Sequence, residues 1–78
     1  MILNVICFGH PMPMRVTKDR PLKHMVKAAI KKSRNDPKRE WELRDAVGSL
    51  LDTESGPEEQ GLEDKARVFL SPKVGSGG

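Results

Sequence analysis

Hydrophobic and polar residues alternate near both ends of the chain and follow a helical period in between. Residues 2–8, ILNVICF, predict a strand because they are rich in β-branched and aromatic side chains. One face of that strand would carry Leu3, Val5 and Cys7, and the other would carry Ile2, Asn4, Ile6 and Phe8. Residues 9–13, GHPMP, predict a turn, and the alternation in residues 14–18, MRVTK, predicts a second strand. We therefore expect an antiparallel hairpin.

A single amphipathic helix is predicted within residues 19–36. Its apolar side chains recur with helical spacing on one face, and they are Leu22, Met25, Val26, Ala29 and Ile30. Pro21 suits the first helical turn, where its missing N–H leaves no bond unmade. We expect Asn35 to adopt the left-handed conformation that ends the helix, and Pro37 prevents its continuation.

The second half of the chain predicts strands and one long loop. Residues 41–44 predict a third strand with Trp41 and Leu43 on one face, and residues 49–51 predict a short fourth strand after a turn at Gly48. The acidic residues 52–66 predict a loop with one short helical turn near Leu62. Residues 66–72, ARVFLSP, predict the last strand.

This order of elements predicts an α+β domain of the β-grasp type. A mixed sheet of four to five strands would pack on one amphipathic helix, and the first and last strands would lie parallel in the middle. Parallel neighbours need a long crossover connection, which the intervening chain supplies. We expect the domain to span residues 1–72 and a flexible Gly-Gly tail to span residues 73–78.

Length, charge and composition narrow the classes of function. A chain of 78 residues makes one domain at most and buries only a thin core. The net charge of +3 is small beside the dense basic face of a dedicated nucleic-acid binder, so we expect no nucleic-acid partner. No apolar run approaches the roughly 20 residues that span a membrane. One cysteine cannot form an internal disulfide, and we expect a cytoplasmic protein.

Candidate catalytic chemistry is scarce. We find no nucleophile motif, no paired carboxylates and no phosphate loop, so we do not expect an enzyme. Cys7 lies on an apolar strand, where cysteine usually behaves as a small buried hydrophobe. Cys7 and His10 have a C-x-x-H spacing, but two ligands do not make a zinc site. We therefore expect no metal and no bound cofactor.

At this point the sequence resembles ubiquitin and its relatives. The resemblance covers nearly the whole chain and includes a hairpin that begins at Met1, the helix segment VKAAI, and a proline just after the helix. It continues through ELRDAVGSLLD at residues 42–52 to the final Gly77 and Gly78. The helix segment and the two glycines are its most specific parts.

The resemblance implies a protein modifier. An activating enzyme would use ATP to adenylate the carboxylate of Gly78, pass it to a cysteine as a thioester, and allow its transfer to a lysine amine. The implied partners are an activating enzyme, a conjugating enzyme, a deconjugating protease and a target protein. Gly77 and Gly78 would be the conjugation residues, because residues without Cβ can enter a narrow active site.

Two departures from ubiquitin point to a dedicated set of enzymes. Ubiquitin carries an arginine before its two glycines, where this chain has Val74, Gly75 and Ser76. Arg44 occupies the place of the exposed isoleucine in ubiquitin's docking patch. Bacterial ubiquitin-like proteins with their own processing enzymes are one such divergent group.

We expect a monomer that docks on its partners through the sheet face that the helix leaves uncovered. The expected partner-binding residues are Ile6, Phe8, Arg44, Leu70 and Val74.

Other functions remain open at this stage. Sulfur-carrier proteins share the fold and the Gly-Gly ending but receive sulfur as a thiocarboxylate. The chain could also be a non-conjugated interaction module, with GSGG as a linker or a cloning scar. The basic helix residues, among them Lys23, Lys27 and Lys31, are most simply a solvated face. RNA binding by that face would fall steeply with salt.

Overall fold

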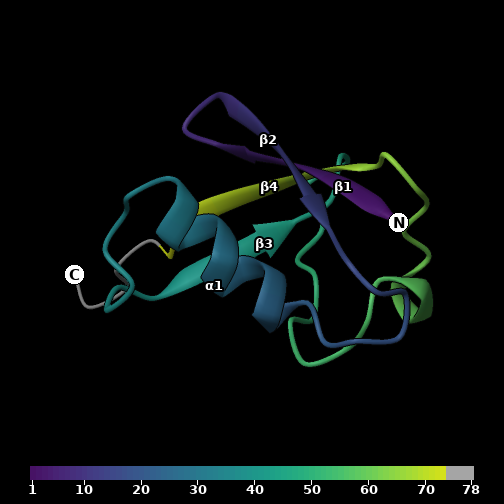
Figure 1. The fold of residues 1–78 in the computed structure, drawn as a ribbon. Coiled ribbons are helices and arrows are strands. Elements are labelled where there is room, and N and C mark those ends of the chain that lie inside the picture. Colours follow the sequence, from purple (N-terminus) through teal and green to yellow (C-terminus); the bar gives the residue numbers. More distant parts are fainter. Residues whose placement is uncertain (74–78) are drawn as a thin grey trace.

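The computed structural model describes residues 1–73, which form one mixed sheet and one α-helix (Figure 1). The elements, in chain order, are β1 (Ile2–Cys7), β2 (His10–Arg15), α1 (Lys23–Lys32), β3 (Trp41–Arg44), the 3-10 helix η1 (Glu58–Gln60) and β4 (Arg67–Pro72). The strand order is β2-β1-β4-β3. β1 and β4 are parallel, and the two outer pairs are antiparallel. The predicted α+β arrangement of the β-grasp type is confirmed.

The core lies between α1 and one face of the sheet (Figure 1). The predicted inward face of residues 2–8 is confirmed, because Leu3, Val5 and Cys7 are all buried. The helix and the other strands complete the core with Leu22, Met25, Val26, Ala29, Ile30, Leu43, Leu51, Val68 and Leu70. In residues 1–73 no helix is long and apolar enough to cross a bilayer.

The second strand begins earlier than the sequence predicted. Residues 9–13 were expected to form a turn, but β2 starts at His10 and contains Pro11 and Pro13. The turn consists of Phe8 and Gly9 alone. Hydrogen bonding alternates along an antiparallel pair, so two prolines that are two residues apart can both turn their nitrogens away from the neighbour. β2 is an edge strand, where that arrangement is tolerated.

Both ends of α1 differ slightly from the prediction. The helix begins at Lys23, so Pro21 precedes the first turn instead of lying within it. At the other end Arg34, not Asn35, has the left-handed conformation, with a φ of 59°. The Asn35 N–H donates to the Ile30 carbonyl and the Arg34 N–H donates to the Lys31 carbonyl. These two bonds form a Schellman-type ending.

The segment after β3 forms a turn and a single bridge, where a short strand was expected. The Asp45 carboxylate accepts bonds from the backbone N–H groups of Val47 and Ser49, which fixes the turn. Leu50 then pairs with Arg44 as an isolated bridge. The sheet of residues 1–73 therefore has four strands.

The acidic loop packs closely against the start of α1. The backbone N–H groups of Leu22 and Lys23 donate to the carbonyls of Ser55 and Thr53, at 3.0 and 2.9 Å. The first N–H groups of a helix have no partner inside it, so this loop supplies acceptors that the helix lacks. The short helical turn expected near Leu62 is η1.

Gly56 is buried where this loop crosses the turn before α1. A Cβ at this position would lie 2.9 Å from the Lys18 carbonyl oxygen, and backbone atoms cannot move aside as side chains do. We expect Gly56→Ala to lower the free energy of unfolding by about 1–3 kcal/mol, as overpacking does elsewhere. Urea unfolding followed by circular dichroism measures this.

The neighbouring variant Ser55→Ala is the control for Gly56→Ala. It removes only an exposed hydrogen bond between the Ser55 hydroxyl and the Asp52 carboxylate, so it should cost less than about 1 kcal/mol. Equal stability of Gly56→Ala and the wild type would show that the loop does not press on the Lys18 backbone as described.

Candidate functional site

One row of side chains crosses all four strands on the sheet face that α1 leaves uncovered. Ile6 of β1 pairs with Pro11 of β2 and with Phe69 of β4, and Phe69 pairs with Arg44 of β3. Paired residues point to the same face of a sheet. We call Pro11, Ile6, Phe69 and Arg44 the outer row. Their alternation with the buried Val5, Leu43, Val68 and Leu70 fixes their outward direction.

The outer row presents apolar surface to solvent. Phe69 is 38% exposed at the centre of the sheet, Pro11 is exposed at its edge, and Ile6 between them is half-buried. Most adjacent outward positions are polar or charged, including Asn4, Arg67 and Glu42. Two are apolar: Pro13 is paired with Asn4, and Leu50, which is 61% exposed, is paired with Arg44. An apolar strip with a polar rim has the layout of a protein-interaction surface.

Arg44 is the β3 member of the row, and its guanidinium group is held in place. Its Nη1 donates to the Gly48 carbonyl at 2.8 Å, and its Nη2 lies 3.5 Å from the Glu42 carboxylate. At this length the partly exposed ion pair contributes little to stability. Together the two contacts fix the direction of the Arg44 side chain. Arg44 therefore places a positive charge beside Phe69, at the border of the apolar surface.

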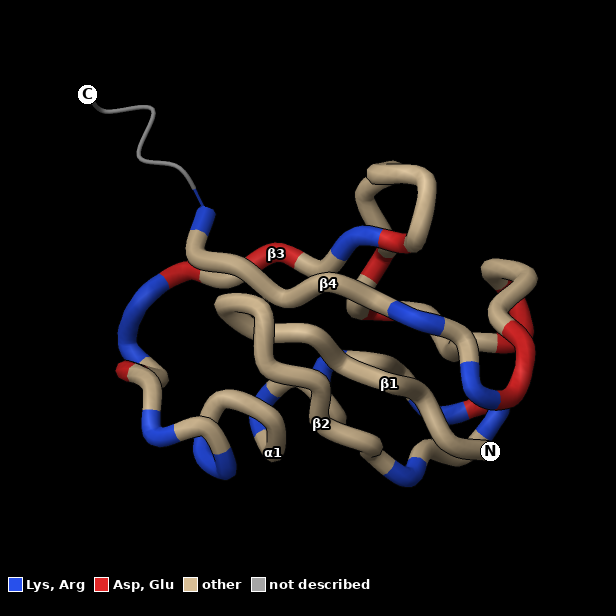
Figure 2. The backbone as a smooth tube through the Cα atoms, turned by 90° about the horizontal axis from the view of Figure 1, so that it is seen from above, with Lys and Arg blue, Asp and Glu red and all other residues tan. Residues whose placement is uncertain are grey.

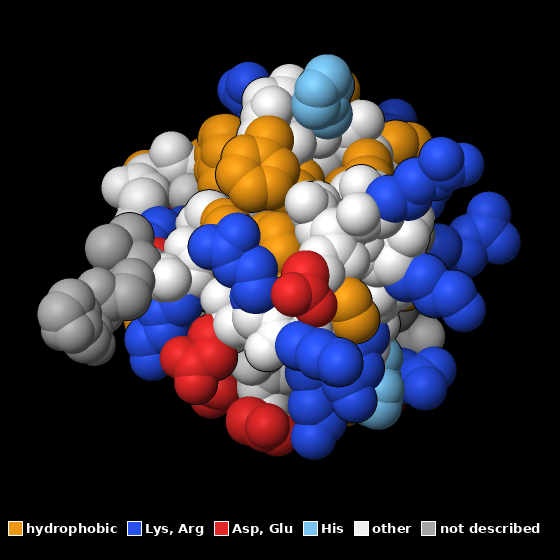
Figure 3. All heavy atoms as spheres, turned by 90° about the vertical axis from the view of Figure 1, so that its left-hand side faces the viewer, with side chains coloured by type: hydrophobic (Ala, Val, Ile, Leu, Met, Phe, Trp, Pro, Cys, Tyr) orange, Lys and Arg blue, Asp and Glu red, His pale blue; other side chains and the backbone are white. Residues whose placement is uncertain are grey.

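Phe8 is a second exposed hydrophobic residue, in the turn between β1 and β2. It is 63% exposed and its ring contacts Trp41 edge to face, with 6.2 Å between the centroids. Figure 3 looks onto this end of the molecule and shows apolar side chains gathered in its upper half. Phe8 and Gly9 have φ values of 50° and 80°, the combination of a tight hairpin turn that favours Asn-Gly. A bulky side chain is strained at such a position.

Three of the predicted partner-binding residues are accessible, and one is not. Ile6 and Arg44 lie together in the outer row, while Phe8 lies apart from it in the turn. The prediction for Leu70 was wrong: it is 2% exposed and faces the core beneath α1, so no partner can contact it. Val74, Gly77 and Gly78 lie outside the described residues.

Phe69 is the surface residue that the sequence reasoning missed. It sits between Val68 and Leu70, both buried, so strand alternation forces it outward. The signal was present in the period of two. Choosing Leu70 instead of its neighbour was a shift of one residue, which transfers a side chain to the opposite face.

Cys7 is buried at the end of β1 near the helix C-terminus. Burial raises the pKa of its thiol, although side-chain hydrogen bonds with Ser33 and Asn35 act in the opposite direction. The Asn35 amide donates to the sulfur at 3.5 Å. A thiol held protonated in this way is a poor nucleophile at neutral pH.

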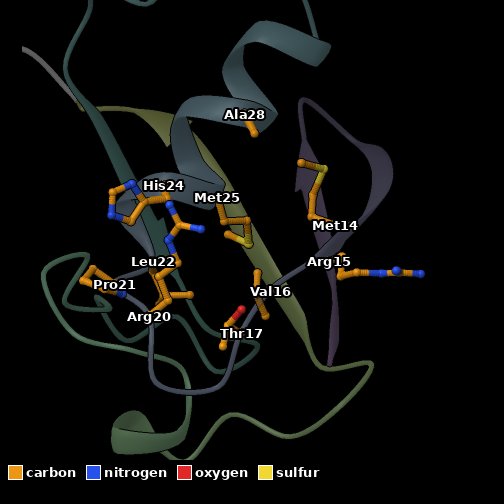
Figure 4. Close-up of a pocket in the computed structure, with 10 residues that line it drawn as sticks. All are labelled: Met14, Arg15, Val16, Thr17, Arg20, Pro21, Leu22, His24, Met25 and Ala28. Atoms are coloured by element: carbon orange, nitrogen blue, oxygen red, sulfur yellow. The ribbon is translucent and has the colours of Figure 1, made fainter.

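A hollow of about 240 Å³ separates β2 from the start of α1 (Figure 4). Its apolar walls include Met14, Val16, Leu22 and Met25. Its charged and polar lining residues are Arg15, Thr17, Arg20 and His24. No carboxylate or thiol lines it. Residues 1–73 contain no cluster of three or more His, Cys, Asp or Glu side chains placed to hold a metal ion.

Comparisons with known proteins place these features in a family. The family described as "Protein of Unknown function (DUF2604)" matches residues 1–78. The chain belongs to the DUF2604 family. It is also similar to the uncharacterized protein y4jI of Sinorhizobium fredii, with 31% identity over 77 residues. That alignment covers 95% of this chain and 58% of the relative, so the chain spans little more than half the relative's length.

A solved structure confirms the fold of this DUF2604 domain. The EccD5 ubiquitin-like domain from Mycobacterium xenopi superposes with a TM-score of 0.68 and covers 92% of each chain. The sequence identity is 15%, so the likeness establishes a ubiquitin-like fold and nothing finer.

A substitution at Phe8 tests whether the turn of this DUF2604 domain is strained. Phe8→Asn should leave the free energy of unfolding unchanged or raise it by up to about 1 kcal/mol. Relief of about 1–3 kcal/mol of backbone strain outweighs the loss of an aromatic contact worth about 0.5–1.5 kcal/mol. Thermal or urea unfolding measures the change.

Phe8→Val is the matched control, since it loses the contact with Trp41 and keeps a side chain unsuited to positive φ. It should be less stable than the wild type. A Phe8→Asn protein that is less stable than Phe8→Val would contradict the assignment of strain to this turn.

Proposed function

We propose that this DUF2604 domain is a ubiquitin-like protein modifier. Its carboxyl group at Gly78 is adenylated with ATP by a separate activating enzyme and is then conjugated to amines of target proteins. The domain is the substrate of this chemistry, and its partners supply the catalytic residues and the ATP site. Use of ATP implies a cytoplasmic location. The proposal concerns the domain with a free carboxylate at Gly78.

The position of β4 is the observation that carries the proposal. β4 is a central strand of a ubiquitin-like sheet and ends at Pro72, only a few residues before Gly77 and Gly78. The backbone N–H of Lys73 still donates to the Glu40 carbonyl, at 2.8 Å. A partner that binds the sheet is therefore within a few residues of the proposed reacting group, and glycines suit close approach to an active site.

The outer row supports docking of the processing enzymes. Phe69, on the strand that leads toward residues 74–78, and Ile6 beside it supply apolar contact area. The fixed positive charge of Arg44 favours partners with an acidic or carbonyl group at that border. This differs from the all-apolar patch that the ubiquitin resemblance would imply, and it favours a dedicated enzyme set.

Tryptic peptide mapping in the native host tests conjugation directly. The last lysine of the chain is Lys73, so trypsin would leave the five residues Val-Gly-Ser-Gly-Gly attached to a target lysine. We expect branched peptides that carry this remnant, detected by mass spectrometry. They should disappear when Gly77 and Gly78 are deleted.

The same samples separate the competing functions. Replacement of one carboxyl oxygen by sulfur in the intact protein, without branched peptides, would identify a sulfur carrier. Full biological activity of the variant that lacks Gly77 and Gly78 would instead identify a non-conjugated interaction module. Either result contradicts the modifier proposal and leaves the ubiquitin-like fold unaffected.

Docking through the outer row is tested with Phe69→Ser. Loss of a central aromatic contact should slow formation of the conjugate by about tenfold or more, because a few buried aromatic side chains dominate interface energies. Ala28→Ser is the control: Ala28 is exposed on α1, on the opposite side of the sheet from the row. Equal conjugation rates for Phe69→Ser and the control would exclude the outer row as a docking site.

A further inference from the structure

The half of the chain that contains α1 carries a strong positive charge that the net charge of +3 conceals. Residues 1–39 contain 10 of the 14 Lys and Arg and only two of the 11 Asp and Glu, a net charge of +8. The remaining residues carry a net charge of −5. Figure 2 shows the blue segments of α1 and the loop after it along one side of the molecule. Charge is therefore divided unevenly between the two halves of the chain.

A groove lies within this basic side, at the C-terminal end of α1. It has a volume of about 530 Å³ and is lined by Lys27, Ile30, Lys31, Arg34, Asn35 and Pro37. We call these six residues the basic groove. Lys38 and Arg39 follow directly in the chain and are also exposed. Figure 3 shows basic side chains along the flank of this end of the molecule.

No salt bridge in the described chain joins an acidic residue to the groove, and the only carboxylate within its sequence segment is that of Asp36. The three salt bridges in residues 1–73 join Lys18 to Glu58, Lys23 to Glu54, and Arg44 to Glu42. None of them involves Lys27, Lys31 or Arg34. The helix dipole favours cations in the last turn, which accounts for Lys31 and Lys32. That effect does not extend to Arg34, Lys38 and Arg39, which lie beyond the helix.

The lining of the groove indicates the chemistry of its occupant. Ile30, which is only 5% exposed, forms an apolar floor, and the exposed Pro37 gives the groove an apolar wall between three basic side chains. Nucleic acid would use the charges but has little to place against Ile30 and Pro37. Single-strand binders also stack bases on aromatic rings. None of the chain's three aromatic residues lines the groove.

We propose that the basic groove binds an acidic segment of a partner protein that inserts an apolar side chain between Ile30 and Pro37. Lys27, Lys31 and Arg34 pair with carboxylates of that segment on either side of the inserted group. The site is on the helix side of the domain, opposite the outer row, so both surfaces can be occupied together. This inference does not rest on conjugation through Gly78.

Peptide binding to the full chain tests the proposal. The probes are a short labelled peptide of alternating Glu and Leu, a matched peptide of Glu and Ser, and a single-stranded RNA, each followed by fluorescence anisotropy. The Glu-Leu peptide should bind most tightly, since it alone offers both carboxylates and apolar groups. Its affinity should fall as salt rises from about 50 to 500 mM, because exposed charges are screened.

A charge-reversed variant locates the binding site. Lys31→Glu combined with Arg34→Glu should weaken binding of the Glu-Leu peptide by about tenfold or more. The matched control is Lys65→Glu combined with Arg67→Glu, which changes the net charge equally at exposed positions near the start of β4, away from the groove. The control should change the affinity by less than about threefold. Circular dichroism verifies that both variants are folded.

Four outcomes overturn the proposal. Tighter binding of the RNA than of either peptide would make the groove a nucleic-acid site. Equal affinity for the two peptides would remove the role of Ile30 and Pro37. An equal loss of peptide affinity in both double variants would show that binding depends only on the overall charge of the protein. Finally, sedimentation that reveals self-association at low salt, abolished by Lys31→Glu with Arg34→Glu, would identify the acidic half of a second copy as the occupant.

Discussion

The parallel pairing of β1 with β4 is the contact on which the rest of this molecule depends. It joins the two ends of the described chain in the middle of the sheet, with Val5 beside Val68 and Cys7 beside Leu70. Those inward side chains are 0–2% exposed and form the base on which α1 packs. Parallel neighbours require a long crossover, so the helix, β3 and the acidic loop must all fit into one connection. The same pairing aligns Ile6 with Phe69 on the opposite face. The register of β1 against β4 therefore determines both the core and the outer row.

Most elements could be predicted from local patterns because their apolar periods are clear. The alternation in residues 2–8 and the helical spacing from Leu22 to Ile30 each fixed an element and its buried face. The errors arose where tertiary context overrode a local preference. Pro11 and Pro13 predicted a turn, yet both lie in an edge strand, where a missing backbone N–H is tolerated. Asn35 is the better residue for a left-handed position, but Arg34 takes it, and the Asn35 side chain contacts Ser33 and Cys7 instead.

The candidate site was only partly predictable, because it depends on register between strands distant in the sequence. Alternation alone could show that Phe69 and Leu70 face opposite ways, but which of them shares a face with Ile6 follows from the pairing of β1 with β4. The acidic loop illustrates the same limit. Its composition predicted a loop, whereas its structural role comes from long-range bonds, such as those from Leu22 and Lys23 to Ser55 and Thr53. Composition does not encode which helix end a loop will cover.

A two-layer domain of this size has no interior beyond its single core, so every other side chain belongs to one of two outer surfaces. Here the two surfaces differ in chemistry. The sheet side presents Phe69 and Ile6 with a charged border, and the helix side presents a basic groove with a small apolar part. At physiological ionic strength charges are screened beyond about 8 Å, so a partner responds to the local patch and not to the net charge of +3. The two surfaces therefore differ in their local charge and apolar area, and a ligand that fits the outer row would gain little from the basic groove.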